Sequence, residues 1–286
     1  MNAERGIGNW AAPAPGLLAG PAGHLAAVIL ATARGFVRRS NAYLIDLLRW
    51  PLFPLIFYAM MYLAYTVSGR DTVGGVDVSA FLLIGMFGFI TWNSMIWSSG
   101  YAVEYERSEG TIAALFLSPA SRVAVIAGYG LGGFVWMLPS FVVVALLGVA
   151  TGARFRVADP LAVLAAVAAL LLGSLATGFA LAGLFILSRR ANLLANFLQR
   201  PGELLSGALF PRESLPGPLH ALSNGLPVSH ALDALRASTL GAATLREILP
   251  AVAVTFAISG AYALVGIVSL RKVEHAAKRT GDLDLY

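Results

Sequence analysis

Long apolar stretches separated by short polar segments run through most of this chain. A helix needs about 20 residues to cross about 30 Å of hydrocarbon, and backbone polar groups inside a bilayer must be satisfied within a helix or a closed barrel. The apolar runs lack the two-residue alternation of a membrane barrel, so they predict helices. Six predicted spans cover residues 49–67, 80–103, 123–150, 160–187, 190–210 and 247–270.

The composition supports an all-α membrane protein. Hydrophobic residues make up 58% of the chain and charged residues 12%, and the mean hydropathy is +0.75. This apolar surface is too large to hide in a soluble core. We expect one six-span transmembrane domain over residues 24–270, a Pro/Gly-rich cytoplasmic tail over 1–23 and a second cytoplasmic tail over 271–286.

Residues 24–48 precede the first span and show helical spacing, with Arg34, Arg38 and Arg39 on one face and apolar residues opposite. The pattern predicts an interfacial helix along the cytoplasmic leaflet. A cleaved signal peptide that ends near residues 31–33 is the alternative. The short apolar region and the leader poor in positive charge disfavour it.

Basic residues are unevenly divided between the two sides of the predicted bilayer. If the N-terminus is cytoplasmic, Arg70, Arg154, Arg156, Arg212, Arg236 and Arg246 are outside, and the other basic residues, apart from Arg200 within the fifth span, are inside. The positive-inside rule then places both termini in the cytoplasm. This asymmetry explains the net charge of +5, and membrane lipid rather than nucleic acid is the expected partner.

The sequence shows no catalytic or metal-binding constellation. The four histidines are scattered, no Gly-x-Ser-x-Gly elbow occurs, and the absence of cysteine excludes disulfides and thiolate metal sites. A P-loop needs Gly-Lys-Ser or Gly-Lys-Thr, yet the first lysine is Lys272, which follows Arg271. We therefore expect no catalytic residue, no metal and no bound cofactor on this chain.

The segment 104–122, between the second and third predicted spans, is charged and partly amphipathic. It opens with acidic residues, continues with apolar residues at helical spacing and ends at Pro119, and Ser121 is placed to cap the next helix. A short helix at the membrane surface fits this pattern, and an ordinary amphipathic loop helix is the alternative. Its notable residues are Glu104, Glu106, Arg107, Glu109, Gly110, Thr111, Leu115, Pro119, Ser121 and Arg122.

This string resembles the cytoplasmic coupling segment of the type-2 ATP-binding-cassette (ABC) exporter permeases. Such segments contain an acidic cluster, Glu/Arg-x-x-Gly-Thr, a leucine-rich turn and Ser/Thr-Pro-x-Ser-Arg. The last predicted external loop also resembles that family, in its Ser-Gly-x-x-Phe-Pro, Leu-Pro and Ala-Leu-Arg landmarks. The residues at these landmarks include Phe210, Pro211, Leu215, Pro216, Pro227 and Arg236.

The resemblance implies a permease that pairs with a second permease, identical or related, and with two ATPase subunits that bind ATP and Mg. Residues 104–122 would couple to the ATPase. Residues 211–236 would form short re-entrant helices that help close an outer gate, with a plain surface loop as the alternative.

Arg200 and Glu203 lie inside the fifth predicted span, where an unpaired arginine costs about 2.5–3.5 kcal/mol. Their spacing allows them to pair on one helix face. Asn196 and Gln199 lie near the same face, so this polar stripe is predicted to line the pathway or the dimer interface. The alternative is a span that begins near Phe197, which leaves Arg200 as an interfacial anchor.

The sequence thus predicts a bacterial inner-membrane exporter subunit for a hydrophobic or amphiphilic compound, such as a drug or antibiotic. A glycan exporter remains open, although spans rich in Ala, Leu, Val and Gly favour the amphiphile. An ion-coupled secondary transporter is a hypothesis of another class, but proton relays usually need several intramembrane acids. A membrane enzyme is a third.

Overall fold

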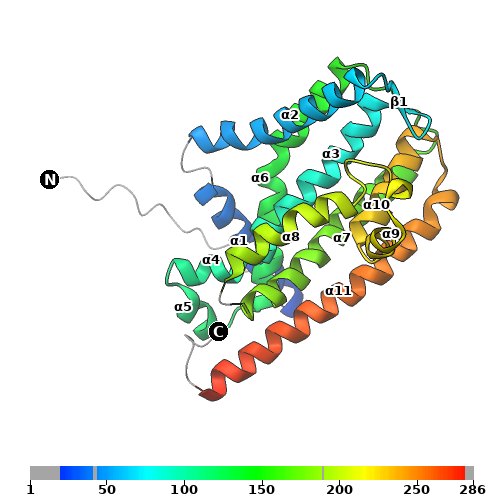
Figure 1. Cartoon of the computed structure of the whole chain (residues 1–286). Helices are drawn as coiled ribbons and strands as arrows, with labels where there is room; N and C mark the ends of the chain where they lie inside the picture. Colours follow the sequence, from blue (N-terminus) through cyan, green and yellow to red (C-terminus); the bar gives the residue numbers. More distant parts are fainter. Residues whose placement is uncertain (1–19, 41–43, 189, 281–286) are drawn as a thin grey trace.

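The structure is a computed structural model, and it describes residues 20–40, 44–188 and 190–280 (Figure 1). The described part is a bundle of helices with one small hairpin. The elements are α1 (Pro21–Ser40), α2 (Leu44–Val67), β1 (Thr72–Val73), β2 (Val76–Asp77), α3 (Val78–Met95), the π-helix η1 (Ile96–Gly100), α4 (Ala102–Ser108), α5 (Ile112–Leu117), α6 (Arg122–Ala150), α7 (Pro160–Ile186), α8 (Ala191–Leu205), the 3₁₀-helix η2 (Arg212–Ser214), α9 (Gly217–Asn224), α10 (Pro227–Leu240) and α11 (Leu245–Thr280).

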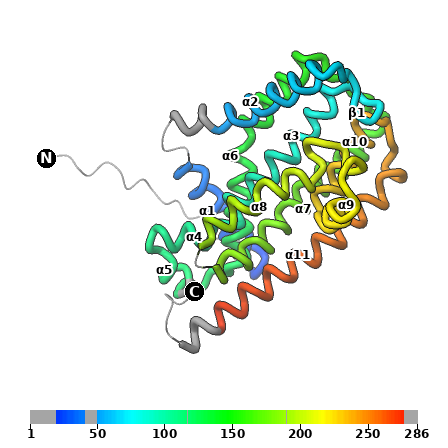
Figure 2. The backbone as a smooth tube through the Cα atoms, in the orientation of Figure 1, coloured from blue at the N-terminus to red at the C-terminus, as the bar shows by residue number. Residues whose placement is uncertain are grey.

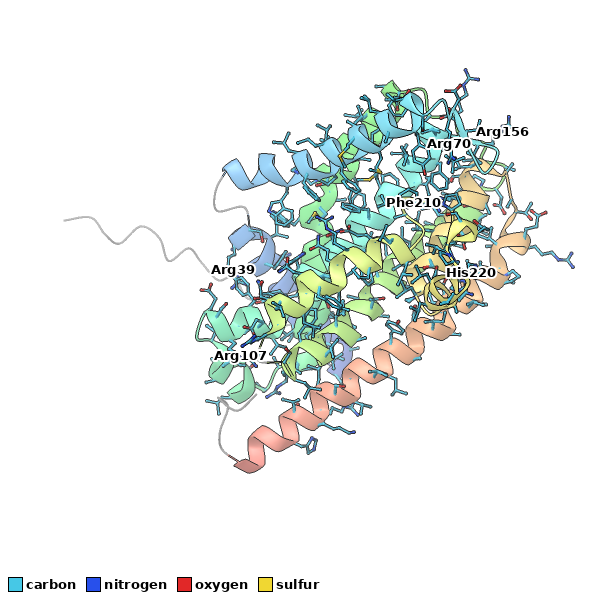
Figure 3. The ribbon with its side chains drawn as sticks, in the orientation of Figure 1. Arg39, Arg70, Arg107, Arg156, Phe210 and His220 are labelled. Atoms are coloured by element: carbon cyan, nitrogen blue, oxygen red, sulfur yellow. The ribbon has the colours of Figure 1, made fainter. Side chains whose placement is uncertain are left out.

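The long helices run between two ends of the molecule (Figure 1). We call them the coupling end, which carries α4 and α5, and the hairpin end, which carries β1, β2, α9 and α10. Arg39 and Arg107 lie at the coupling end, whereas Arg70, Arg156 and Phe210 lie at the hairpin end (Figure 3).

Five helices within the described residues are long and apolar enough to cross a membrane: Trp50–Val67, Val78–Gly100, Arg122–Ala150, Pro160–Ile186 and Leu245–His275. They match five of the six predicted spans to within a few residues. The predicted span 190–210 does not meet this criterion, because α8 has 15 residues. The backbone at Gly207 turns to φ +74°, a left-handed conformation typical of the residue just past a helix end.

The chain nevertheless travels back toward the hairpin end between α7 and α11. A side chain added at Gly173 would meet Thr255, and one added at Gly183 would meet Ser269, so later residues of α7 face later residues of α11. The two helices are therefore parallel neighbours. Since both run toward the coupling end, the segment that contains α8 must return the chain, as the tube in Figure 2 shows.

Three other features of the fold differ from the prediction. The predicted helix 24–48 is two elements, because α1 ends at Ser40 and α2 already begins at Leu44. The hairpin was not expected; it pairs Thr72 with Asp77. Helix α11 continues to Thr280, into the segment expected to be a tail.

Helix α3 lies at the centre of the bundle, and nearly all of its residues are buried. Helix α1 packs along the first half of α6, where added side chains at Gly128 and Gly132 would strike Thr32 and Phe36. Phe36 is buried while Arg34 and Arg38 are exposed, so α1 has an inner and an outer side. Its position at a membrane surface stays a prediction.

At the hairpin end, Asp159 ties the starts of α7 and α11 together. Its carboxylate accepts from the backbone N–H of Leu245 at 2.9 Å and of Leu161 at 3.0 Å. These hydrogen bonds lower the pKa of Asp159 below its usual value, and the bond from Leu245 has the largest effect. The parallel packing of the two helices is therefore anchored where both begin.

Candidate functional site

The segment expected to couple to an ATPase folds as two short helices joined by a tight turn. α4 ends at Ser108 and α5 begins at Ile112. Gly110 lies in the turn with φ +72°, and nothing lies within 4 Å of a side chain that would be added there. Glycine is thus required for the backbone conformation, rather than for close packing within this chain.

Glu106 points into the protein and joins α4 to two other elements. Its carboxylate accepts from the hydroxyls of Tyr129 on α6 and Thr111 in the turn. Arg39 at the end of α1 donates to the Tyr129 hydroxyl at 3.0 Å and lies over the Tyr105 ring at 4.3 Å. The coupling segment is therefore attached to α1 and α6 by a polar network, and Figure 3 shows Arg39 of α1 beside this segment.

The other predicted coupling residues divide into internal and exposed ones. Arg107 pairs with Glu104 at 2.5 Å, and Arg122 lies 3.6 Å from Glu274 on α11. Ser121 caps α6, as predicted, by accepting from the backbone N–H of Ala124. Leu115 is partly buried, while Glu109, Gly110, Thr111, Pro119 and the unpredicted Leu117 are exposed. Contact of this surface with an ATPase stays a prediction.

The second candidate region joins α8 to the central helix α3. Arg200 and Glu203 form the predicted ion pair, with 2.9 Å between Arg200 Nη1 and Glu203 Oε2. Asn93 donates to the other carboxylate oxygen of Glu203 at 3.1 Å. The Glu203 side chain is 2% exposed and that of Arg200 is 59% exposed, so the acid is fixed inside and the base reaches outward.

Gln199 completes this polar cluster. Its amide donates to Asn93 Oδ1 at 2.5 Å, its side-chain oxygen accepts from the Trp97 indole at 3.3 Å, and its backbone oxygen accepts from Trp92 at 3.1 Å. A side chain added at Gly202 would lie 1.8 Å from the Trp92 ring, so α8 approaches α3 closely. Asn196 lies outside this cluster, because it is exposed and donates to Asn192, and its predicted place on the pathway or the dimer interface stays a prediction.

A cavity of about 330 Å³ opens beside this cluster, between α2, α3, α6 and α8. Asn93, Gln199 and Arg200 form its polar wall. The apolar wall consists of Trp50, Phe53, Phe89, Ile90, Trp97 and Met137.

A further charged cluster lies at the hairpin end. Arg212 is buried and donates to Asp233 and to Asn224. Arg236 donates to the backbone oxygen of Ala208 at 3.2 Å and lies 4.0 Å from the centre of the Phe81 ring. Burial lowers the pKa of Arg236 to about 10, against the opposing effect of Asp233, so the guanidinium stays charged at neutral pH.

Arg212, Asp233 and Arg236 line a cavity of about 400 Å³ between the hairpin and α10. Of the predicted gate residues, Pro211 and Arg236 line this cavity, whereas Pro227 is buried at the start of α10. Phe210 is 40% exposed, Leu215 is partly buried and Pro216 is exposed. The segment 211–236 is helical in short pieces, as predicted, and its depth in a membrane stays a prediction.

Sequence reasoning missed the partners of several predicted residues. Asn93 and Tyr129 were not among the candidates, although each contacts a candidate acid. Arg212 and Asp233 are 21 residues apart and meet only because α9 folds between them. Asn93 could have been noticed as a polar residue inside a long apolar run, but the sequence does not show that it contacts Glu203. Among the described residues, no group of three or more His, Cys, Asp or Glu side chains is placed to hold a metal.

Comparison with known proteins identifies the family of this chain. The profile of the ABC-2 type transporter family matches residues 25–240. A search of curated proteins gave no match. Because the match covers well over half of the 286 residues, the chain belongs to the ABC-2 type transporter family. It is a membrane-spanning permease component of a family that generally works with an ABC ATPase.

Proposed function

We propose that this permease is the membrane subunit of an ATP-driven exporter that moves an amphiphilic compound, of the drug or antibiotic kind, out across the bacterial inner membrane. ATP and Mg are bound by two copies of a separate ATPase. The coupling end faces the cytoplasm, where both termini lie, and the hairpin end faces outward. The sixth crossing of the bilayer is made by α8 and the residues up to Phe210.

The exposed apolar tip of the coupling segment carries this proposal. Leu117 is 85% exposed and is the last residue of α5, a helix at the coupling end (Figure 1). Ala113 and Ala114, one helical turn before Leu117, are exposed as well, so α5 presents a contiguous apolar face that a partner protein can cover. Through Glu106, Tyr129 and Arg39, movement of this tip is transmitted to α6 and α1.

A second permease is proposed to cover the outer face of α8. Leu193 and Phe197 are 67% and 69% exposed there, and Leu204 is 45% exposed. These positions follow helical spacing and form one apolar stripe. Arg200 lies on the same stripe, so the cavity beside α3 opens next to the proposed subunit interface. The gate is assigned to η2, α9 and α10 at the hairpin end.

Co-purification of the permease with an ABC ATPase from its native membranes tests the assignment. Leu117→Asp places a charge in the proposed contact and should lower recovery of the ATPase at least tenfold, because burying one leucine contributes about 1.5–3 kcal/mol. The yield of folded permease should not change. ATP hydrolysis stimulated by the permease should fall in parallel.

Leu222→Asp is the matched control, since Leu222 is 60% exposed on α9 at the opposite end. It should leave ATPase binding unchanged. Equal recovery of the ATPase with Leu117→Asp and with the unchanged chain would remove the main support for the coupling assignment.

A further inference from the structure

We infer that the cavity between α2, α3, α6 and α8 binds a planar aromatic compound with an acidic group, and that Arg200 selects the acid. This inference rests on the proposed function, because it names the substrate class of that exporter. The volume of about 330 Å³ lies within the range of small-molecule sites, about 300–1,000 Å³. Mostly apolar walls with a few polar groups are also typical of such sites.

The aromatic wall favours a flat ring over a flexible chain. Phe53 and Phe89 both line the cavity and are roughly parallel, with 6.1 Å between their centroids and 26° between their planes. Trp50 and Trp97 lie on the same wall. A planar ring can stack on such side chains in offset or edge-to-face geometry, which adds to the burial of apolar area.

Among the residues whose side chains the structure describes, the cavity wall carries one charged group, the guanidinium of Arg200, while Glu203 is buried behind it. Both carboxylate oxygens of Glu203 already accept, one from Arg200 and one from Asn93. A guanidinium carries five N–H groups, and one of them donates to Glu203 among the described residues.

The neighbouring amides do not offset this positive character. The side-chain oxygens of Asn93 and Gln199 accept from Gln199 and Trp97 respectively. The groups with N–H still available to a ligand here are the Arg200 guanidinium and the Gln199 amide, among the described residues. A carboxylate, sulfonate or phosphate on the ring would form charge-assisted hydrogen bonds with Arg200, whereas an ammonium group would be repelled.

Three probes that share one ring test this inference: 1-pyrenebutyrate, 1-pyrenebutanol and 1-pyrenebutylamine. Binding is followed as saturable energy transfer from tryptophan to pyrene, with purified permease in phosphatidylcholine nanodiscs and no ATPase. The unchanged chain should bind the butyrate about tenfold more tightly than the butylamine, with the butanol between them. This ratio follows from one charge-assisted hydrogen bond in a partly desolvated site.

The Arg200→Gln/Glu203→Gln double variant removes the cation without leaving a buried acid behind. It should keep its affinity for the butanol and bind the butyrate and butylamine within about twofold of each other. Arg200→Lys should retain the preference for the butyrate. Arg156→Gln removes an exposed arginine at the hairpin end and is the control that should change nothing.

A preference for the butyrate that persists in the double variant would overturn the inference. So would equal binding of all three probes by the unchanged chain. Absence of saturable transfer would also overturn it, and would indicate a cavity filled by lipid. None of these results bears on ATPase co-purification, so failure here and failure of the exporter assignment are distinguishable.

Discussion

Two ion pairs in this protein are built in opposite ways. In the pair beside α3, the acid Glu203 is 2% exposed and the base Arg200 is 59% exposed. In the pair at the hairpin end, the base Arg212 is 6% exposed and the acid Asp233 is 42% exposed. Each buried member also receives an amide partner, Asn93 for Glu203 and Asn224 for Arg212.

Which member of the ion pair is buried determines what each pair can do. A buried charge with two fixed partners holds elements together, while an exposed partner can meet a ligand. At the hairpin end the fixed charge is a guanidinium that joins η2 to α9 and α10. Beside α3 the fixed charge is a carboxylate that joins α8 to α3 and presents a cation outward. The first arrangement suits a rigid closure and the second suits recognition of an acid.

The largest effect is expected from Asp233→Ala. It leaves Arg212 buried with a positive charge that cannot be lost by deprotonation. Breaking a buried pair in this way costs about 3–5 kcal/mol. Thermal unfolding in nanodiscs should show the loss as a large drop in the midpoint temperature.

Glu213→Ala is the matched control for Asp233→Ala, because Glu213 is an exposed acid on the same cavity. Its effect on the free energy of unfolding should stay within about 0.5 kcal/mol. Comparable losses in the two variants would mean that Arg212 does not depend on its pairing with Asp233.

Sequence patterning could place five long helices because span length is a strong and local signal. Within residues 190–210 it did not predict where the helix ends, because the apolar run continues beyond the end of α8 at Leu205. Gly207 ends α8 through its left-handed backbone, and a hydropathy pattern carries no such information. The two-residue strands of the hairpin were likewise too short to leave a periodic pattern.

The next effect is expected from Arg200→Ala, and it should be smaller. Glu203 is left buried, but it keeps the hydrogen bond with Asn93, and water can take the place of an Arg200 side chain that is 59% exposed. A loss of about 1–3 kcal/mol is expected. The Arg200→Ala/Glu203→Ala double variant should recover part of it, because no buried charge remains.

Arg190→Ala is the control here, since Arg190 is exposed at the start of α8. Additive losses in the single and double variants, measured by thermal unfolding, would favour an interfacial anchor at Arg200 over a coupled pair.

The candidate site could be predicted only within one helix. The spacing of Arg200 and Glu203 was sufficient to propose their pairing, because positions three apart on a helix are neighbours. Asn93 lies 110 residues from Glu203, and a single sequence does not specify which faces of α3 and α8 meet. The contact of Glu106 with Tyr129 could not be predicted for the same reason, since Tyr129 belongs to another helix.

The smallest effect concerns the two amides that support the buried charges. Asn224 is exposed, so water can replace its oxygen as an acceptor for Arg212, and Asn224→Ala should cost about 1 kcal/mol. Asn93 is 9% exposed, and its side chain bonds Glu203, Gln199 and the Phe89 backbone. Asn93→Ala should therefore cost more, about 2 kcal/mol, since water has less access to the groups left behind. Thermal unfolding of the two variants side by side measures the difference. A larger loss for Asn224→Ala would reverse the comparison and make the hairpin end, rather than the contact of α3 with α8, the place where buried polar groups depend most on their amide partner.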